Sequence, residues 1–129
     1  MKRHYVLTLA MLSGLAFGAA AVQALHAQTK PAVYYIAEVD VTDLDGYLKE
    51  YAPKAAASSK AFGGQTLAAG QEITQIEGAP AKRRVVIVKW ESLEQLQAWR
   101  NSDQYKADRK IGDKYAKIRA FAVEGLPTN

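Results

Sequence analysis

Hydrophobic and polar residues alternate over several short segments of the chain, which is the pattern of β-strands with one buried face. The alternation is clearest over residues 33–41, which are rich in β-branched and aromatic side chains. Residues 83–90 are predicted to form the strongest strand, and the aliphatic run 85–88 predicts burial on both of its faces. A last strand is predicted over residues 117–124.

The segment 65–77 has a weaker strand pattern. Two short apolar pieces, 66–69 and 73–77, stand on either side of Gly70-Gln71, which predicts either one bulged strand or a small hairpin. Glycine and proline in residues 78–80 predict a turn before the next strand.

A first helix is predicted over residues 44–62, where apolar residues recur at three- and four-residue spacing. Thr42, followed three residues later by Asp45, fits a capping box at its start. Pro53 lies inside the pattern and is predicted to kink the helix or to divide it in two. Gly63-Gly64 predicts the helix end, because glycine readily adopts the left-handed conformation found there.

A second helix is predicted to follow residue 91, because Ser92 and Gln95 fit another capping box. Ser102 interrupts this helix and is predicted to cap its continuation toward Tyr115. The apolar stripe expected to face the sheet consists of Leu93, Leu96 and Trp99.

The predicted element order is β-α-β-β-α-β, which indicates an α+β fold of the ferredoxin-like type with an antiparallel sheet and helices on one face. The other face of such a sheet is bare, yet Tyr34, Ile36, Phe121 and Val123 are predicted to lie on it. Because monomers rarely expose so much apolar surface, two sheets are expected to pack face to face as a homodimer, a dimeric α/β barrel.

The first 27 residues have the features of a secretory signal peptide. Lys2 and Arg3 precede an uncharged run over residues 5–22, and small residues lead to possible cleavage after Ala24 or Ala27. The run is also nearly long enough for a membrane-spanning helix, so an uncleaved anchor is the alternative. We expect a linker over 28–32, a folded domain over 33–129, and a periplasmic or secreted location.

The sequence has no cysteine, and its two histidines, His4 and His26, both lie in the removable segment. Removal of residues 1–27 lowers the formal charge from +4 to +2, so the charge does not predict a nucleic-acid partner. A membrane partner is expected only if the first segment is retained. We expect no metal and no cofactor, because thiolate and disulfide chemistry are closed to the chain and imidazole chemistry is closed to a chain cut after Ala27.

Seven short stretches of the chain match a known family in the right order along almost the whole mature chain. They are 43–47, 51–53, 62–64, 76–78, 98–99, 101–105 and 123–125. With these stretches the chain resembles the family known as domain of unknown function 1330, a branch of the dimeric α/β barrel superfamily. The resemblance implies the fold and the dimer but no particular activity. The chain departs from it at Leu44, where proline is usual, and at Gln65-Thr66, where Arg-Tyr is usual.

The candidate ligand-binding residues are Glu38, Arg119, Tyr34 and Arg84. Glu38 and Arg119 lie within strands that are neighbours in this fold, on a face whose other residues are largely apolar, and a carboxylate there needs a partner. Arg83 or Arg84 is expected beside Glu38, so that arginines in the cleft between the two sheets hold an anionic ligand. The alternative is a structural cross-strand ion pair.

Other candidate sites have simpler interpretations. Asp43, Asp45 and Glu50 fit a helix start better than a metal site. The basic run 106–117 fits a solvated helix face. The many large aromatic residues fit either core packing or a pocket for a planar ligand.

Two functional classes follow from these predictions. The first is a module that binds a small organic ligand in the cleft between the sheets, without chemistry. The second is a cofactor-free enzyme, of the monooxygenase or isomerase type, acting on a small organic acid or aromatic compound. The sequence does not identify catalytic residues for the second class.

Overall fold

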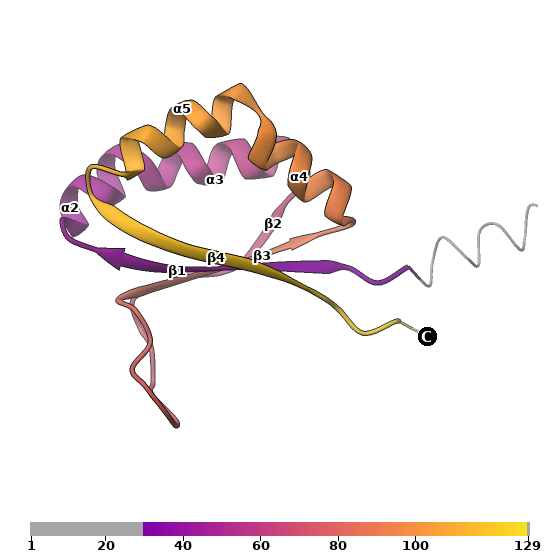
Figure 1. Cartoon of the computed structure of the whole chain (residues 1–129), viewed down its shortest axis with the longest axis horizontal. Coiled ribbons are helices and arrows are strands. Elements are labelled where there is room, and N and C mark those ends of the chain that lie inside the picture. Colours follow the sequence, from indigo (N-terminus) through magenta and orange to yellow (C-terminus); the bar gives the residue numbers. More distant parts are fainter. Residues whose placement is uncertain (1–29, 129) are drawn as a thin grey trace, which may run out of the picture. The chain divides into compact units, whose positions relative to one another are not determined.

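The computed structural model describes residues 30–128, and Pro31–Leu126 form one compact unit. Four antiparallel strands make a single sheet in the order β2-β3-β1-β4 (Figure 1), so the predicted ferredoxin-like α+β fold is confirmed. The predicted signal segment, residues 1–27, lies outside the described residues. The strands are β1 (Val33–Val41), β2 (Gln65–Gly70), β3 (Arg84–Trp90) and β4 (Ala116–Glu124).

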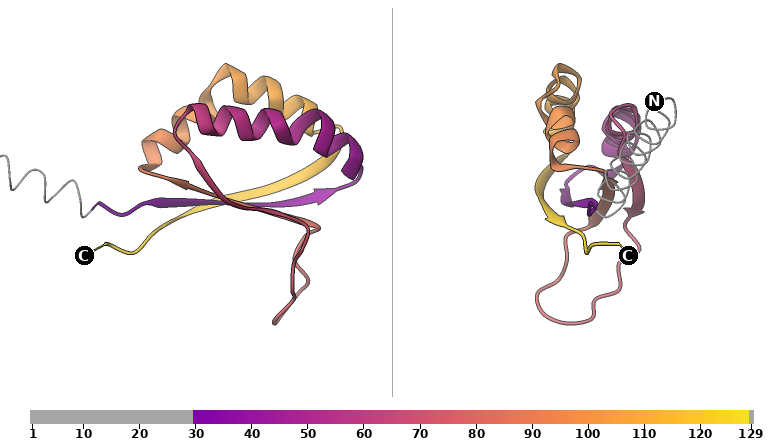
Figure 2. Two further views of the ribbon diagram at one scale, coloured as in Figure 1. Left: turned by 180° about the vertical axis from the view of Figure 1, so that it is seen from behind. Right: turned by 90° about the vertical axis from the view of Figure 1, so that its right-hand side faces the viewer.

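The helices of residues 30–128 lie on one face of the sheet, as Figures 1 and 2 show, so helices and sheet form two layers. No helix within residues 30–128 is both long enough and apolar enough to span a membrane. The helical elements are α2 (Leu44–Gly46), the π-helix η1 (Tyr47–Tyr51), α3 (Ala52–Ala61), α4 (Leu93–Asn101) and α5 (Asp103–Gly112).

The predicted capping residues are right in two of three cases. Ser92 and Ser102 each accept a hydrogen bond from the backbone N–H three residues later, at the starts of α4 and α5. The prediction of a Thr42 cap is wrong, because Asp43 caps α2 by accepting from the N–H of Gly46. The Thr42 hydroxyl instead donates to the carbonyl of Tyr115 at 2.8 Å. This bond joins the residue after the end of β1 to the residue before the start of β4.

Pro53 divides the first helical segment, as the sequence predicts. Proline has no N–H to bond the carbonyl four residues earlier, and the N–H of Ala52 reaches back to the carbonyl of Tyr47, five residues away. The resulting π-helical turn places both Tyr47 and Tyr51 in the buried layer. The segment ends as expected at Gly63, whose φ of 99° is the left-handed conformation that favours glycine.

The segment after β2 differs from the prediction, because residues 73–77 are not a strand. Residues 71–83 form an open loop on the side of the sheet opposite the helices (Figure 1). The Gln75 amide organises this loop by donating to the carbonyls of Glu77, Gly78 and Ala79. The expected bulge is present, but inside β2, where the pairing register shifts between Thr66 and Ala68.

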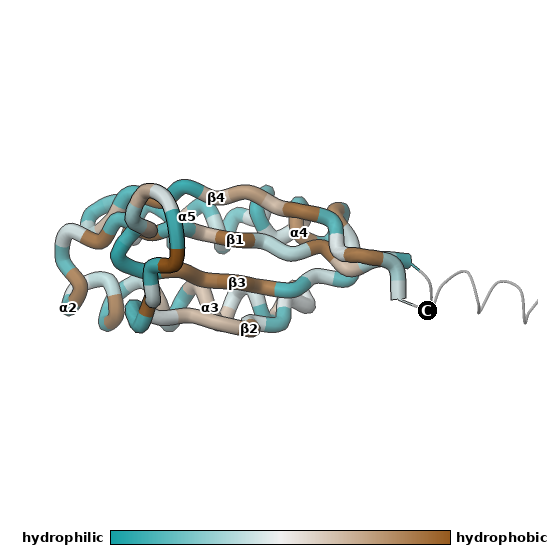
Figure 3. Tube along the Cα trace, turned by 90° about the horizontal axis from the view of Figure 1, so that it is seen from below, coloured by the Kyte–Doolittle hydropathy of each residue, from teal (hydrophilic) through white to brown (hydrophobic). Residues whose placement is uncertain are grey.

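The core lies between the helices and the sheet. Every odd-numbered residue of β1 is buried and the even-numbered ones are half-buried, which confirms the alternation predicted for this strand. Residues 85–87 of β3 are also half-buried, so burial on both faces is incomplete in the single chain. Leu93 is exposed rather than core-facing, whereas Leu96 and Trp99 are buried as predicted. Figure 3, seen from the side opposite the helices, shows apolar stretches along the strands.

Candidate functional site

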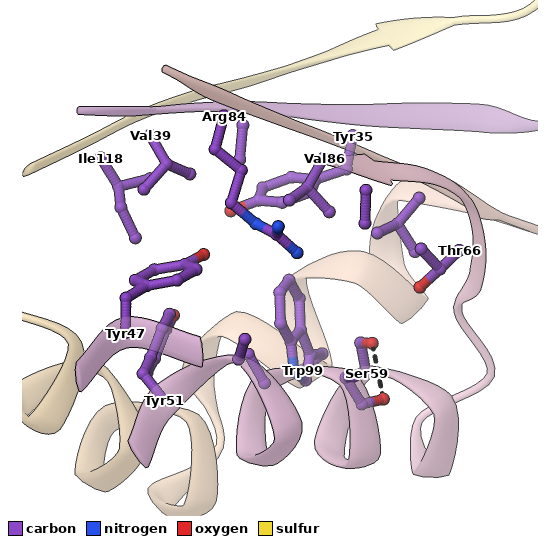
Figure 4. Close-up of a pocket in the computed structure, with 16 residues that line it drawn as sticks. Tyr35, Val39, Tyr47, Tyr51, Ser59, Thr66, Arg84, Val86, Trp99 and Ile118 are labelled. Carbon is purple, nitrogen blue, oxygen red and sulfur yellow. Dashed lines mark hydrogen bonds between the residues drawn. The ribbon is translucent and has the colours of Figure 1, made fainter. Parts of the chain in front are cut away.

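A cavity of about 80 Å³, measured as space for the centres of water molecules, lies between the helices and the sheet (Figure 4). Its roof is formed by all four strands, β4 through Ile118 alone, and its floor by η1, α3 and α4. Its walls are mainly apolar and aromatic, with one arginine. The lining residues are Tyr35, Ala37, Val39, Tyr47, Tyr51, Ala52, Ala55, Ala56, Ser59, Thr66, Ala69, Arg84, Val86, Val88, Trp99 and Ile118.

The two-residue period of the strands determines which side chains enter this cavity. In β3, Arg84, Val86 and Val88 point to the helices, whereas the residues between them point to the open face. Small side chains on the opposing helix, Ala52, Ala55 and Ala56 among them, leave the space unfilled. The cavity therefore results from large residues on the sheet facing alanines on α3.

Arg84 is the charged residue in the cavity lining, and only 9% of its surface is exposed. Its Nη1 donates to Oε1 of Gln71 at 2.8 Å, while its Nε is buried without a hydrogen-bond partner. Its guanidinium carbon lies 5.5 Å from the centre of the Tyr47 ring, within range of a cation–π contact. A buried guanidinium donor without a partner is energetically costly, so this group is prepared to bind another acceptor.

Three tyrosines bring hydroxyl groups to the cavity. Burial is the main reason that the pKa of Tyr35 rises to about 12 and that the pKa values of Tyr47 and Tyr51 also rise. For Tyr47 the neighbouring Arg84 guanidinium opposes that rise. The Tyr35 hydroxyl accepts a hydrogen bond from Nη1 of Arg100 at 3.0 Å. At neutral pH these phenols are protonated, so they offer hydrogen-bond donors rather than bases.

Trp99 forms a fixed aromatic wall of the cavity. Its ring packs edge-on against Tyr35 with centroids 5.4 Å apart, and it stacks on Trp90 at 5.3 Å. Its indole N–H donates to the Ser58 hydroxyl at 3.0 Å, which fixes the ring to α3. A wall held by contacts to both the sheet and the helix layer is pre-organised for a planar ligand.

The cavity opens to the surface between α3 and the edge strand β2. The lining residues that are solvent-exposed, Ala56, Thr66 and Ala69, all lie on these two elements. Gln71 follows directly after β2 and is itself exposed, so the partner of Arg84 stands on the same side as this opening.

The predicted Glu38–Arg119 pair exists, on the open face of the sheet. The two residues are directly paired across β1 and β4, and Nη1 of Arg119 lies 2.5 Å from Oε2 of Glu38. The Arg119 side chain is 73% exposed and its guanidinium carbon lies 5.2 Å from the Phe121 ring centre. Tyr34, paired with Val123, lies on the same face. The structure thus brings Glu38 and Arg119 together and places Tyr34 on the same face, four residues along β1, and their ligand-binding role stays a prediction.

The expected position of Arg84 beside Glu38 is wrong. Arg84 pairs with Val39, so its side chain shares the helix-facing side of the sheet with Val39 and not the open face with Glu38. Arg83 is not a partner of Glu38 either, because its Nη1 donates to the carbonyl of Val41 at 3.1 Å. The sequence prediction did not fix the register between β1 and β3, and a difference of one residue in register exchanges the two faces.

The acidic group at the first helix has the structural role that the sequence favours. Asp43 caps α2, and Asp45 pairs with Lys49 at 2.9 Å on the exposed surface. Within residues 30–128 no three histidine or acidic side chains are arranged to hold a metal ion.

Comparison with known proteins gives a family and a fold. A comparison with curated proteins finds no match. The RPA0582 protein of Rhodopseudomonas palustris, of unknown function, is 14% identical with a TM-score of 0.58, covering 75% of this chain and 84% of that one. SnoaB of Streptomyces nogalater, a cofactor-independent oxygenase, is 9% identical with a TM-score of 0.58, covering 76% and 96%. At these identities the likeness shows a shared fold.

A match to a family model identifies the family to which the chain belongs. A family model described as a domain of unknown function, DUF1330, matches residues 32–126, which include all four strands and all the described helices. The resemblance stated from the sequence is confirmed, and the chain belongs to the DUF1330 family.

Proposed function

We propose that this protein binds a small planar organic molecule in the cavity between the helices and the sheet. The observation that carries the proposal is Arg84, a buried guanidinium with an unpartnered Nε in an otherwise apolar and aromatic cavity. Ligand sites commonly combine such walls with a few polar groups that fix orientation. This position replaces the cleft between two sheets that the sequence alone favoured.

The tyrosine hydroxyls support binding more directly than chemistry. Because the pKa values of Tyr35, Tyr47 and Tyr51 are raised, these groups donate hydrogen bonds at neutral pH and are poor proton acceptors. A cofactor-free oxygenase is the second candidate, because SnoaB has this fold and that activity. Oxygen consumption with a bound compound would distinguish the second candidate from the first.

The size of the cavity defines suitable probes. Its volume of about 80 Å³ is smaller than the ~150 Å³ cavity that accommodates benzene. Crotonate and crotonamide have as many non-hydrogen atoms as benzene, so part of either molecule would extend through the opening between α3 and β2. The two are planar and nearly equal in shape but differ in charge, which makes them a matched pair of probes. We expect at least one of them to shift the Trp99 indole resonance in an NMR titration of the protein.

A matched pair of variants on α3 tests whether the probes bind in the cavity. Ala55→Phe fills the cavity and is expected to abolish the shifts, whereas Ala57→Phe, two residues along the same helix at an exposed position outside the lining, is expected to retain them. Shifts with neither probe, or equal loss in both variants, would overturn the proposed function.

The same proposal includes a homodimer formed through the open face of the sheet. This face carries Phe121, 43% exposed, together with exposed Val123 and half-buried Ile36. A second copy would cover these residues, since a symmetric interface places the same patch on both subunits. Light scattering is expected to report twice the chain mass.

Substitutions at two residues of similar exposure test this interface. Phe121→Asp is expected to give monomers, whereas Leu93→Asp, at a residue 46% exposed on the helix layer, is expected to leave the dimer intact. Monomers in the unsubstituted protein would contradict the proposal. We also propose that the protein acts in the periplasm or after secretion, on the basis of residues 1–27 of the sequence.

A further inference from the structure

The buried arginine also indicates the chemical class of the ligand. We infer that the cavity selects a small planar carboxylate, and that the carboxylate binds the edge of the Arg84 guanidinium that Gln71 leaves open. This inference rests on the proposed function, because it concerns the ligand of the same cavity.

The geometry of the Arg84 guanidinium favours a carboxylate. Gln71 occupies Nη1, while Nε lacks a partner. The Nε–H and one N–H of Nη2 lie on a common edge of a guanidinium group, and this edge binds the two oxygens of a carboxylate in parallel hydrogen bonds. An amide offers a single acceptor oxygen and no charge, so it satisfies less of the group than a carboxylate does.

Gln71 leaves this edge accessible from the opening of the cavity. It bonds only Nη1, and it is exposed and is the first residue after β2, so its side chain can move aside without breaking a pair in the sheet. The Gln71 amide carries no charge, and the ion pairs of the described residues do not include Arg84. An incoming carboxylate therefore supplies the counter-charge that the guanidinium lacks.

The charge around the tyrosines also favours an anion. Positive charge from Arg84 and Arg109 acts on Tyr47, and Arg109 also acts on Tyr51. The protonated phenols add donors, so an anion entering the cavity meets positive charge and hydrogen-bond donors. Tyr47 and Trp99 contribute the aromatic surface for the planar part of the ligand.

The test compares crotonate with crotonamide at pH 7 by NMR titration of the full mature chain. In the unsubstituted protein crotonate is expected to bind at least about tenfold more tightly, as a charge-assisted pair in a buried site implies. Arg84→Gln is expected to remove this preference while retaining crotonamide binding. Arg84→Lys keeps the charge without the paired donors and is expected to give an intermediate preference.

Variants of two glutamines test which edge of the guanidinium the carboxylate binds. Gln71→Ala frees only Nη1, so crotonate affinity is expected to change by less than about threefold, within the net contribution of one hydrogen bond. Gln75→Ala, in the same loop but bonded only to loop backbone groups, is expected to leave crotonate affinity unchanged. A rise of about tenfold or more in Gln71→Ala would show that the carboxylate competes with Gln71 for Nη1, which would contradict the assigned edge.

The outcomes separate this inference from the function on which it rests. Binding of both probes with equal affinity, or a preference that survives in Arg84→Gln, would overturn the carboxylate assignment and leave the cavity as a binding site. Binding of neither probe would overturn the proposed function itself. Amide spectra of each variant check that it is folded, and the Arg84→Lys result remains informative if Arg84→Gln does not fold.

Discussion

Arg84 and Glu38 lie on adjacent, paired strands but on opposite faces of the sheet. Arg84 is the register partner of Val39, and Glu38 is the partner of Val85. One residue of register therefore places the arginine in the helix-side cavity and the carboxylate on the open face. The two groups belong to different surfaces, and substitutions in them are expected to have separate effects.

The first prediction concerns Arg119→Gln. This change removes the charge that pairs with Glu38, whose own side chain is 24% exposed, on the face proposed to meet a second subunit. Loss of one partner of a charge pair buried by association is expected to weaken the dimer about tenfold or more. Analytical ultracentrifugation of the variant measures this effect.

The same variant serves as a control for the cavity. Crotonate affinity is expected to stay the same, because Arg119 is not in the cavity lining. A strong loss of crotonate binding with an intact dimer would instead support a ligand site at Glu38 and Arg119.

The second prediction concerns Gly64→Ala. A Cβ at this position would lie 2.8 Å from Cζ2 of Trp90 and 3.0 Å from Cγ1 of Val88, both buried. Such overpacking is expected to lower the free energy of unfolding by about 1 to 3 kcal/mol. Gly70→Ala is the matched control in the same strand region, because a Cβ there meets no atom within 4 Å. Equal destabilisation in the two variants would show that close approach of Trp90 is not the cause.

The third prediction concerns stability at high pH. Burial raises the pKa of Tyr35 to about 12 from its ordinary value of 10.0. Above pH 10 the unfolded chain loses this proton while the folded chain keeps it, so the free energy of unfolding is expected to fall as the pH rises toward 12. A shift of this size corresponds to about 2 to 3 kcal/mol. Denaturant unfolding at several pH values between 8 and 12 measures the decrease.

Tyr35→Phe is the comparison variant for this experiment. It removes the titrating hydroxyl and the hydrogen bond from Arg100, so it is expected to be less stable at pH 8 but to lose less stability between pH 10 and 12. An identical decrease in both proteins would assign the effect to other groups.

The fourth prediction concerns export. The basic start, apolar run and small-residue zone of residues 1–27 predict a mature chain beginning at Leu25 or Gln28. Sequencing of the amino terminus of exported protein identifies the start. Recovery of protein with intact Met1 in the membrane fraction would instead indicate an uncleaved anchor.

Much of the fold could be predicted because the strongest signals are local. The alternation of β1 and the caps Ser92 and Ser102 depend on near neighbours in the sequence, and the structure confirms them. The face of Arg84 could not be predicted in this way, because it depends on the register between β1 and β3, which are far apart in the sequence.

The existence of the cavity could not be predicted from local sequence patterns either. The sequence shows that aromatic residues are abundant and that a planar ligand is one explanation, but not that Tyr35, Tyr47 and Trp99 converge on the alanines of α3. The unpartnered Nε of Arg84 is likewise a property of the folded chain. The one signal available was the arginine directly before the aliphatic run 85–88.

The alternation within β3 limits which kinds of mutation the protein tolerates. Arg84, Val86 and Val88 line the cavity, and the intervening residues carry the open face, so the two surfaces are interleaved along one short segment. Point substitutions can alter either surface alone, whereas insertion or deletion of one residue exchanges the two sets of side chains. Changes of length are therefore expected to accumulate in loop 71–83, which precedes the strand and tolerates them, while β3 keeps a constant length among relatives.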